Sequence, residues 1–156
     1  MIDETVEYIA ICRLQSAYAD AVNRRAWLEL AALFTADAHV VVDTMTNPVI
    51  ETDGGEGIAS FIEGAIERFE FFEFVRLNTV VWFDDDDHAR GRLFMCELRQ
   101  TRESHEFSRA FGVYHDNYVR VDGRWRFGDR HYQSLARPET GEVFAYPSGE
   151  DQLPNR

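Results

Sequence analysis

Four long stretches of alternating apolar and polar residues fill the second half of the chain, and they constrain the fold more than any other feature. They cover residues 74–83, 89–101, 107–121 and 124–134. Alternation with a period of two predicts β-strands with one buried face. Four aspartates predict a turn after the first stretch, and Asp122-Gly123 favours a tight hairpin between the last two. The pattern therefore predicts a meander of long antiparallel strands.

The first half of the chain has helical rather than alternating periodicity. Apolar residues recur at helical spacing over residues 3–23 and 57–69, and residues 27–34 predict a short helix between them. Residues 38–43 are rich in valine and predict one strand. Helices followed by a strand meander favour the α+β class, with the helices packed on one face of a curved sheet.

The domain organisation is expected to be simple. A chain of 156 residues fits one domain, which we place at residues 1–137. Residues 138–156 contain several glycines and prolines and predict an irregular tail that could cover a pocket mouth or a neighbouring subunit.

The charge of the chain excludes several functions. Aspartate and glutamate number 28 against 16 basic residues, which gives a formal net charge of −12. Such a surface repels phosphate backbones and anionic lipids, so neither nucleic-acid nor membrane binding is expected. All the basic residues are arginine, and the absence of lysine excludes Schiff-base chemistry.

Cys12 and Cys96 are too few for a disulfide framework and lack metal-site spacing, so we expect free thiols and no metal. The N-terminus is acidic and no apolar run approaches the length of a membrane span. These features favour a cytoplasmic protein.

Local motifs, in their order along the chain, resemble one protein family. They are LFTADA at residues 33–38, GVYHDNY at 112–118 and DGRWRF at 122–127, followed by Arg130. Together with the order of elements they resemble the SnoaL-like branch of the NTF2-like superfamily, similar to scytalone dehydratase, over residues 3–135. The resemblance implies a cone in which three N-terminal helices pack on a strongly curved, mostly antiparallel sheet.

The resemblance also implies a range of functions. Members of the branch are mostly cofactor-free enzymes that act on hydrophobic rings, and some relatives are assembly subunits. We therefore expect a cofactor-independent lyase, dehydratase or isomerase that binds an aromatic or polycyclic small molecule. The alternatives are a non-catalytic binding or assembly module, and an enzyme resembling polyketide cyclases or epoxide hydrolases. A long antiparallel sheet leaves one face to cover, which favours a homodimer or homotrimer.

The chain departs from this family at the residues that usually perform the chemistry. Dehydratase-like members use an Asp at the end of the first helix and a His on the first long strand, and these positions fall on Asn23 and Phe74. Neither side chain can abstract a proton at neutral pH. Asn23 could keep a hydrogen-bond donor role or simply cap the helix.

Other groups must then supply any catalysis. Glu97 lies in an apolar strand, where burial would raise its pKa and favour a general base; a structural ion pair or a solvent-facing Glu is the alternative. Tyr114 and Tyr18 could donate hydrogen bonds to a developing oxyanion or only pack. Arg130 could hold an anionic oxygen, if a bulge at Gly128 turns it inward, or pair with Asp116.

Strand alternation predicts further residues of the cavity. The candidate substrate-binding residues are Arg76, Asn78, Phe74, Val42, Met95, Leu93 and Trp82. Ketosteroid isomerases of the superfamily carry their base on the first strand, where a single bulge would bring Asp43. The histidines, including His115 and His131, are out of phase with the inward residues or lie near turns, and we expect them at the surface.

Overall fold

The N-terminal helix α1 (Glu4–Arg24) is capped at both ends. In this computed structural model, which describes residues 1–146, the Asp3 carboxylate accepts hydrogen bonds from the backbone N–H groups of Thr5 and Val6. Arg25 ends the helix in the left-handed conformation, with φ of 58°. One side of α1 is buried against the sheet through Glu7, Ile11, Leu14, Gln15, Tyr18, Ala21 and Val22.

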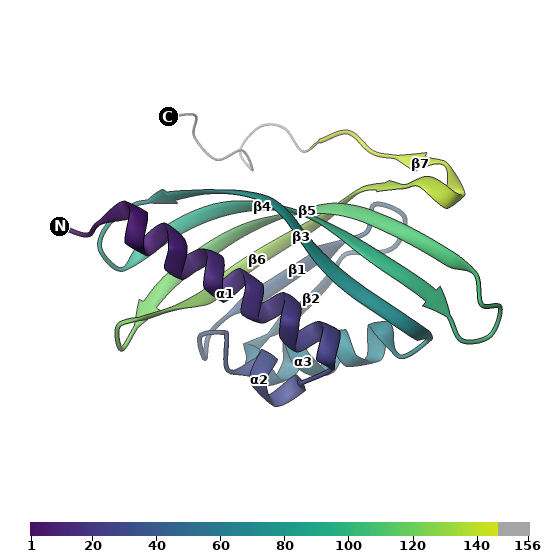
Figure 1. Ribbon diagram of the computed structural model, residues 1–156, viewed down its shortest axis with the longest axis horizontal. Helices are drawn as coiled ribbons and strands as arrows, with labels where there is room; N and C mark the ends of the chain where they lie inside the picture. Colours follow the sequence, from purple (N-terminus) through teal and green to yellow (C-terminus); the bar gives the residue numbers. More distant parts are fainter. Residues whose placement is uncertain (147–156) are drawn as a thin grey trace.

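One curved sheet and two further helices complete the architecture (Figure 1). The helices are α2 (Trp27–Ala31) and α3 (Gly54–Ile66), and a 3₁₀ turn, η1, covers Pro138–Thr140. The strands are β1 (His39–Asp43), β2 (Ile50–Asp53), β3 (Phe69–Phe83), β4 (His88–Thr101), β5 (Phe107–Val121), β6 (Arg124–Arg137) and β7 (Glu142–Val143).

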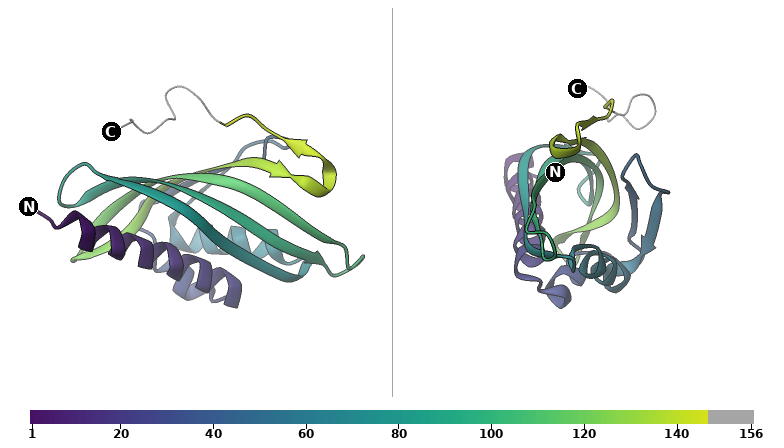
Figure 2. Two further views of the ribbon diagram at one scale, coloured as in Figure 1. Left: turned by 45° about the horizontal axis from the view of Figure 1, so that its top comes forward. Right: turned by 90° about the vertical axis from the view of Figure 1, so that its right-hand side faces the viewer.

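The strands lie in the order β2-β1-β6-β5-β4-β3, with β7 paired to β6. All pairs are antiparallel except β1 with β6, which are parallel. Seen end-on, the long strands curl around a central space that α3 closes from below (Figure 2, right). The predicted α+β cone with three helices on a curved, mostly antiparallel sheet is therefore confirmed.

Two short strands and several element boundaries differ from the sequence predictions; the helix predicted over residues 27–34, for example, ends at Ala31. β2 and β7 were not predicted, because each is short and neither has a clear apolar alternation. The helix predicted over residues 57–69 ends at Ile66, and Phe69 is instead the first residue of β3. The segment from Phe69 to Glu73 pairs with the end of β4. This pairing makes the segment a strand, although its apolar residues recur at helical spacing.

A bulge in β3 overturns part of the predicted cavity. The register between β3 and β4 shifts by one residue between Arg76 and Thr79, so the alternation of faces reverses there. Asn78 is consequently exposed, while Thr79 bonds to Gln15 of α1. Trp82 likewise lies beyond the bulge and outside the cavity lining. The guanidinium carbon of Arg92 lies 5.5 Å from the centroid of its ring.

A second bulge, in β6, was predicted correctly. Asp116 pairs with Arg130 and Tyr118 with Phe127, so β6 carries one extra residue in the interval that contains Gly128. Arg130 and Phe127 are therefore buried on the same side, 1% and 0% exposed. A straight strand would have turned Arg130 to the opposite face.

Side chains of α1 cover the free edge of β3, which has no strand beyond it. The Asn23 amide bonds twice to the backbone of Phe74: its Oδ1 accepts from the N–H at 2.6 Å and its Nδ2 donates to the C=O at 3.1 Å. Arg25 donates to the carbonyl of Phe69 at 3.0 Å. These bonds satisfy backbone groups that a sheet edge would otherwise expose. Asn23 is thus a structural link between α1 and β3.

The C-terminal segment lies on the outer face of the sheet, away from the helices (Figure 1, yellow). The Tyr146 ring stacks on Phe94, with centroids 6.2 Å apart. Its hydroxyl accepts a hydrogen bond from Arg92 at 3.1 Å and lies 3.0 Å from Nε2 of His115. The tail predicted as irregular therefore contains η1 and β7 up to residue 146, and its residues 147–156 lie outside the described part.

Cys12 and Cys96 are free. Within residues 1–146, no helix combines the length and apolar character that crossing a membrane requires.

We expect Asn23→Ala to destabilise the protein by about 1–3 kcal/mol, because it leaves the N–H and C=O of Phe74 without their partner. Urea unfolding followed by circular dichroism measures this change. Ser16→Ala, at an exposed position of the same helix, is the control and should stay within about 0.5 kcal/mol of the wild type. Equal stability of both variants would show that the link contributes nothing.

Candidate functional site

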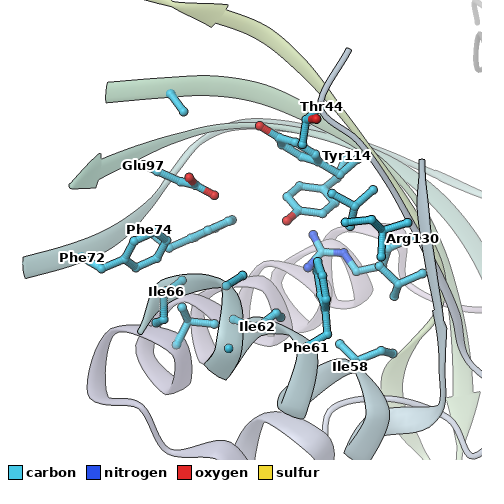
Figure 3. A pocket seen from close by; sticks show the side chains of 18 of the residues that line it. Thr44, Ile58, Phe61, Ile62, Ile66, Phe72, Phe74, Glu97, Tyr114 and Arg130 are labelled. Atoms are coloured by element: carbon cyan, nitrogen blue, oxygen red, sulfur yellow. The ribbon is translucent and has the colours of Figure 1, made fainter. Parts of the chain in front are cut away.

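A cavity of about 520 Å³ lies between α3 and the concave face of the sheet. Helix α3 contributes an apolar floor, and the strands contribute aromatic rings and the few polar groups (Figure 3). The apolar lining includes Val40, Val42, Ile50, Ile58, Phe61, Ile62, Ile66, Phe69, Phe72 and Phe74. A concave, mostly apolar cavity with few polar groups is typical of a small-molecule site.

Among residues 1–146, Glu97 is the only carboxylate that lines this cavity, and no histidine lines it. Alternation along β4 turns it to the same face as Leu93 and Met95, as predicted. Leu93 and Met95 are 0% exposed and belong to the core, whereas the Glu97 side chain is 22% exposed. Glu97 therefore lies where β4 passes from the core to the cavity.

Burial raises the pKa of the Glu97 carboxyl above its ordinary value, and the nearby positive charges of Arg99 and Arg68 counteract this only in part. The nearest cationic atom is Nη1 of Arg99, 3.6 Å from Oε2. No hydrogen bond from residues 1–146 occupies the carboxylate, so it can accept a proton from a molecule in the cavity.

Three tyrosines present phenols to the same space. Burial raises the pKa of Tyr18 and raises that of Tyr114 well above the ordinary value for tyrosine. Burial also raises the pKa of Tyr132 to about 12, and its hydroxyl lies 3.2 Å from Oγ of Ser134. The negative charge of Glu97 adds to the effect at all three. These phenols stay protonated near neutral pH and can act as hydrogen-bond donors.

Arg130 forms the other end of the site, and its charge is balanced from behind. Its Nε and Nη2 donate to the Asp116 carboxylate at 2.7 and 3.3 Å. The guanidinium carbon lies 3.8 Å from the ring centroid of Tyr114 and 4.4 Å from that of Tyr18. Burial lowers the pKa of Arg130, but the charge and hydrogen bond of Asp116 together with Tyr18 and Tyr114 outweigh it, so the pKa is raised and the side chain stays cationic. Its Nη1 has no partner among the described residues.

A buried hydrogen-bond chain supports this ion pair. The Tyr118 hydroxyl donates to Asp116 at 2.9 Å and accepts from Nε2 of Gln15 at 2.7 Å. Gln15 in turn accepts a hydrogen bond from Arg76 at 3.0 Å. The chain ties α1 to β3, β5 and β6 behind the cavity and holds the orientation of Arg130.

The structure thus brings together part of the predicted site. Glu97 and Arg130 lie at two sides of the cavity, with Tyr114 between them (Figure 3). The predicted residues that line the cavity are Glu97, Tyr114, Arg130, Tyr18, Phe74 and Val42. Those outside the lining are Asn23, Arg76, Asn78, Leu93, Met95 and Trp82.

Each of the remaining residues has another position or partner. Arg76 belongs to the buried chain, and Asn23 bonds to β3. Asp43 does not line the cavity, because β1 keeps an unbroken register with β6. The Oδ1 of Asp43 instead accepts a hydrogen bond from the backbone N–H of Met45. The bulge that isomerase chemistry at Asp43 would require is therefore not present in this strand.

The histidines lie outside the cavity, as predicted. His39, His88 and His105 pair with acidic residues at the surface. His115 and His131 face each other across β5 and β6, and neither lines the cavity. Within residues 1–146, no group of three His, Cys, Asp or Glu side chains is arranged to hold a metal ion.

Sequence reasoning missed several cavity residues. Tyr132 follows Arg130 by two positions and shares its face, so the same alternation would have found it. Its ring occupies the space that the missing side chain of Gly112 leaves, since a Cβ at Gly112 would come within 2.2 Å of it. Arg68 and Arg99 also line the cavity. Arg99 follows Glu97 by two positions along β4, so the alternation of that strand places both on one face.

Comparison with known proteins supports the fold described above. The sequence model of the SnoaL-like domain family matches residues 3–131, so the chain belongs to the SnoaL-like family. A scytalone dehydratase-like protein from Novosphingobium aromaticivorans superimposes with a TM-score of 0.77 and 22% identity, over 93% of this chain and 92% of that one.

Hexachlorocyclohexane dehydrochlorinases have the same fold. LinA superimposes with a TM-score of 0.77 and 24% identity, over 92% of this chain and 97% of its own. The type 3 enzyme from Novosphingobium barchaimii gives a TM-score of 0.76 and 23% identity over the same shares. No curated protein shows significant similarity to the chain.

The raised pKa of Glu97 predicts a pH-dependent loss of stability. The folded protein binds a proton at Glu97 more tightly than the unfolded chain does, so stability falls as pH rises from the unfolded pKa to the folded pKa. Glu97→Gln removes this loss. We expect the variant to equal the wild type in stability near pH 4 and to be the more stable of the two at pH 8.

Thermal unfolding at both pH values measures the difference. Glu73→Gln makes the same chemical change at an exposed position of β3. It should leave the stability of the protein unchanged at either pH. A stability advantage of Glu97→Gln that is the same at pH 4 and pH 8 would contradict a raised pKa.

Proposed function

We propose that the protein is a cofactor-independent lyase or isomerase that acts on an apolar, ring-containing small molecule by proton abstraction. Glu97 is the general base. Tyr114 and Tyr18 donate hydrogen bonds to the oxygen on which negative charge develops, and Arg130 stabilises that charge.

The observation that carries the proposal is the isolation of Glu97. It is the only carboxylate that the described part of the chain contributes to an apolar cavity, and the groups across the cavity from it are phenols and a buried cation. A base must be ionised and yet gain from accepting a proton, and a carboxyl with a raised pKa meets both needs near neutrality. The phenols and Arg130 are hydrogen-bond donors fixed in a low-dielectric wall, which strengthens their effect on developing negative charge.

The proposed reaction needs no group beyond these side chains. The Glu97 carboxylate takes a proton from a carbon next to a carbonyl, and the electron pair moves onto the carbonyl oxygen. In an elimination, this pair forms a C=C bond and expels the leaving group, with a departing hydroxide taking the proton back from Glu97. In an isomerisation, the Glu97 carboxylic acid returns the proton to another carbon. The dehydratase and dehydrochlorinase names of structural neighbours support the elimination.

A binding or assembly module is the second candidate, and one observation favours it. Asn23 and Phe74 stand where dehydratase-like members carry their Asp and His, and the Asn23 amide is fully engaged by the Phe74 backbone. Such a protein would bind apolar ligands without converting them. The homodimer or homotrimer expected from the sheet is compatible with both candidates and stays a prediction.

Turnover by Glu97 variants separates the candidates. The wild type is incubated with a panel of cyclic β-hydroxy and β-halo ketones, and loss of water or halide is followed by mass spectrometry. Deuterium uptake from D₂O reports proton abstraction without elimination. We expect Glu97→Gln to lower the rate about 1000-fold and Tyr114→Phe about 100-fold.

The matched control is Glu73→Gln, which should keep the wild-type rate because Glu73 does not line the cavity. Full turnover by Glu97→Gln would remove the proposed base. Ligand binding with neither elimination nor deuterium uptake anywhere in the panel would favour the binding module.

The ionisation of Glu97 also predicts the pH profile of the reaction. Because the carboxylate must be free to accept a proton, kcat/KM should rise with pH through a single ionisation. Its midpoint should lie above the ordinary glutamate pKa of about 4.3, since burial raises the pKa of Glu97. A rate that is independent of pH between 4 and 9 would assign the base to another group.

A further inference from the structure

Four arginines of residues 1–146 line the cavity, in a chain whose net charge is −12. Two of them have acidic partners within the protein. Arg130 pairs with Asp116 and keeps one free nitrogen, Nη1, and Arg137 donates to Glu142 and to the backbone carbonyl of Thr44. The side chains of the other two, Arg68 and Arg99, donate no hydrogen bond within this part of the chain and can meet a second part of a bound molecule.

Arg68 and Arg99 gather around one aromatic ring. The guanidinium carbon of Arg68 lies 4.8 Å from the centroid of Phe69, and that of Arg99 lies 5.4 Å from it. Neither guanidinium donates a hydrogen bond within residues 1–146, and Nε of Arg99 is buried without a partner. Within residues 1–146 the two arginines form a single ion pair, between Nη1 of Arg99 and Oε2 of Glu97. These atoms lie 3.6 Å apart, farther than in a hydrogen bond. Aromatic stacking therefore holds two arginines whose N–H groups remain available.

The two arginines lie toward the open end of the cavity. Along β4, Leu93 and Met95 are fully buried, whereas the side chains of Glu97 and Arg99 are 22% and 15% exposed. Arg68 is exposed, and Arg130, at 1% exposed, marks the deep end. A molecule that enters past Arg68 and Arg99 meets Glu97 next and the phenols beyond it.

We propose that Arg68 and Arg99 bind a carboxylate on the substrate, so that the substrate class is an apolar ring system with an anionic group at its outer end. This inference rests on the proposed function, since it takes the cavity as the substrate site. Guanidinium groups bind carboxylates through paired N–H donors, with more specificity than an ammonium group provides. The negative charge of the remaining surface repels anions, which makes a local positive site the feature that admits them.

The anchored carboxylate would orient the substrate for reaction. Its ring would extend from the two arginines past Glu97 toward Tyr114, which places the reacting carbon between base and donors. The carboxylate would also compete with Glu97 for Arg99. Because Arg99 and Arg68 both lower the pKa of Glu97, their engagement by a ligand raises its pKa and makes it a stronger base.

Binding of matched ligand pairs tests this inference without any need for turnover. The probes are benzoate, 2-naphthoate and 9-anthracenecarboxylate, each compared with the corresponding aryl methanol by calorimetry at pH 7.5. We expect the best-fitting carboxylate to bind about tenfold more tightly than its alcohol. Arg68→Gln combined with Arg99→Gln should abolish this preference and leave the Kd of the alcohol unchanged, which also shows that the cavity is intact.

Arg102→Gln is the matched control. Arg102 is an exposed arginine near the same end of β4, its Nε donates to the carbonyl of Glu67, and it does not line the cavity. This variant should keep the preference for carboxylates. If it loses the preference as completely as the double variant does, the effect depends only on net charge and the proposal is overturned.

Two further outcomes would overturn it and differ in what they leave standing. If the alcohols bind as tightly as the carboxylates, the anionic substrate class is wrong, while the apolar site and the role of Glu97 remain. If no member of any pair binds, both this inference and the apolar substrate of the proposed function are lost.

Discussion

The buried ion pair between Asp116 of β5 and Arg130 of β6 determines how the interior of this protein is built. Both side chains are almost fully buried, 2% and 1% exposed, and removing two charges from water costs several kcal/mol per ion unless their geometry and remaining hydrogen bonds are good. The chain meets this requirement with two bonds between the pair, a third to Asp116 from Tyr118, and aromatic rings around the guanidinium. The extra residue in β6 near Gly128 turns Arg130 inward, so the pair and the bulge depend on each other.

Glu97 and Arg130, two of the charged groups that line the cavity, lie apart from each other. Arg99 and Arg68 lower the pKa of Glu97, whereas Arg130 is paired with Asp116 and lowers the pKa of Tyr18 and Tyr114. The cavity keeps a carboxyl of raised pKa at one side and a fixed cation at the other, with Tyr114 between them (Figure 3). Acid–base chemistry on an apolar molecule needs this separation.

The sequence was sufficient for the parts of the structure that follow from periodicity. Helix α1, the long strands and the inward direction of Glu97 and Tyr114 all come from regular spacing, and Gly128 was enough to suggest the bulge at Arg130. The bulge before Thr79 has no glycine or proline to mark it, so the predictions for Asn78 and Trp82 failed together. Arg68 follows the end of α3, outside any alternating stretch, and only the folded chain brings it to Phe69 beside Arg99 of β4. Contacts of this kind depend on tertiary structure and leave no periodic signal.

The replacement of the usual dyad has a structural explanation. An Asp at position 23 could accept from the Phe74 N–H but could not donate to its carbonyl, so only the amide of Asn23 completes both bonds to the edge of β3. Phe74 fills the cavity wall next to Tyr18, with ring centroids 5.2 Å apart, where a histidine would need a polar partner. The wall formed by α1 and β3 is thereby apolar and tightly linked. Glu97 is the cross-strand neighbour of Phe74 on β4, so the one carboxylate among the described lining residues stands directly beside the position where the family resemblance implies a histidine.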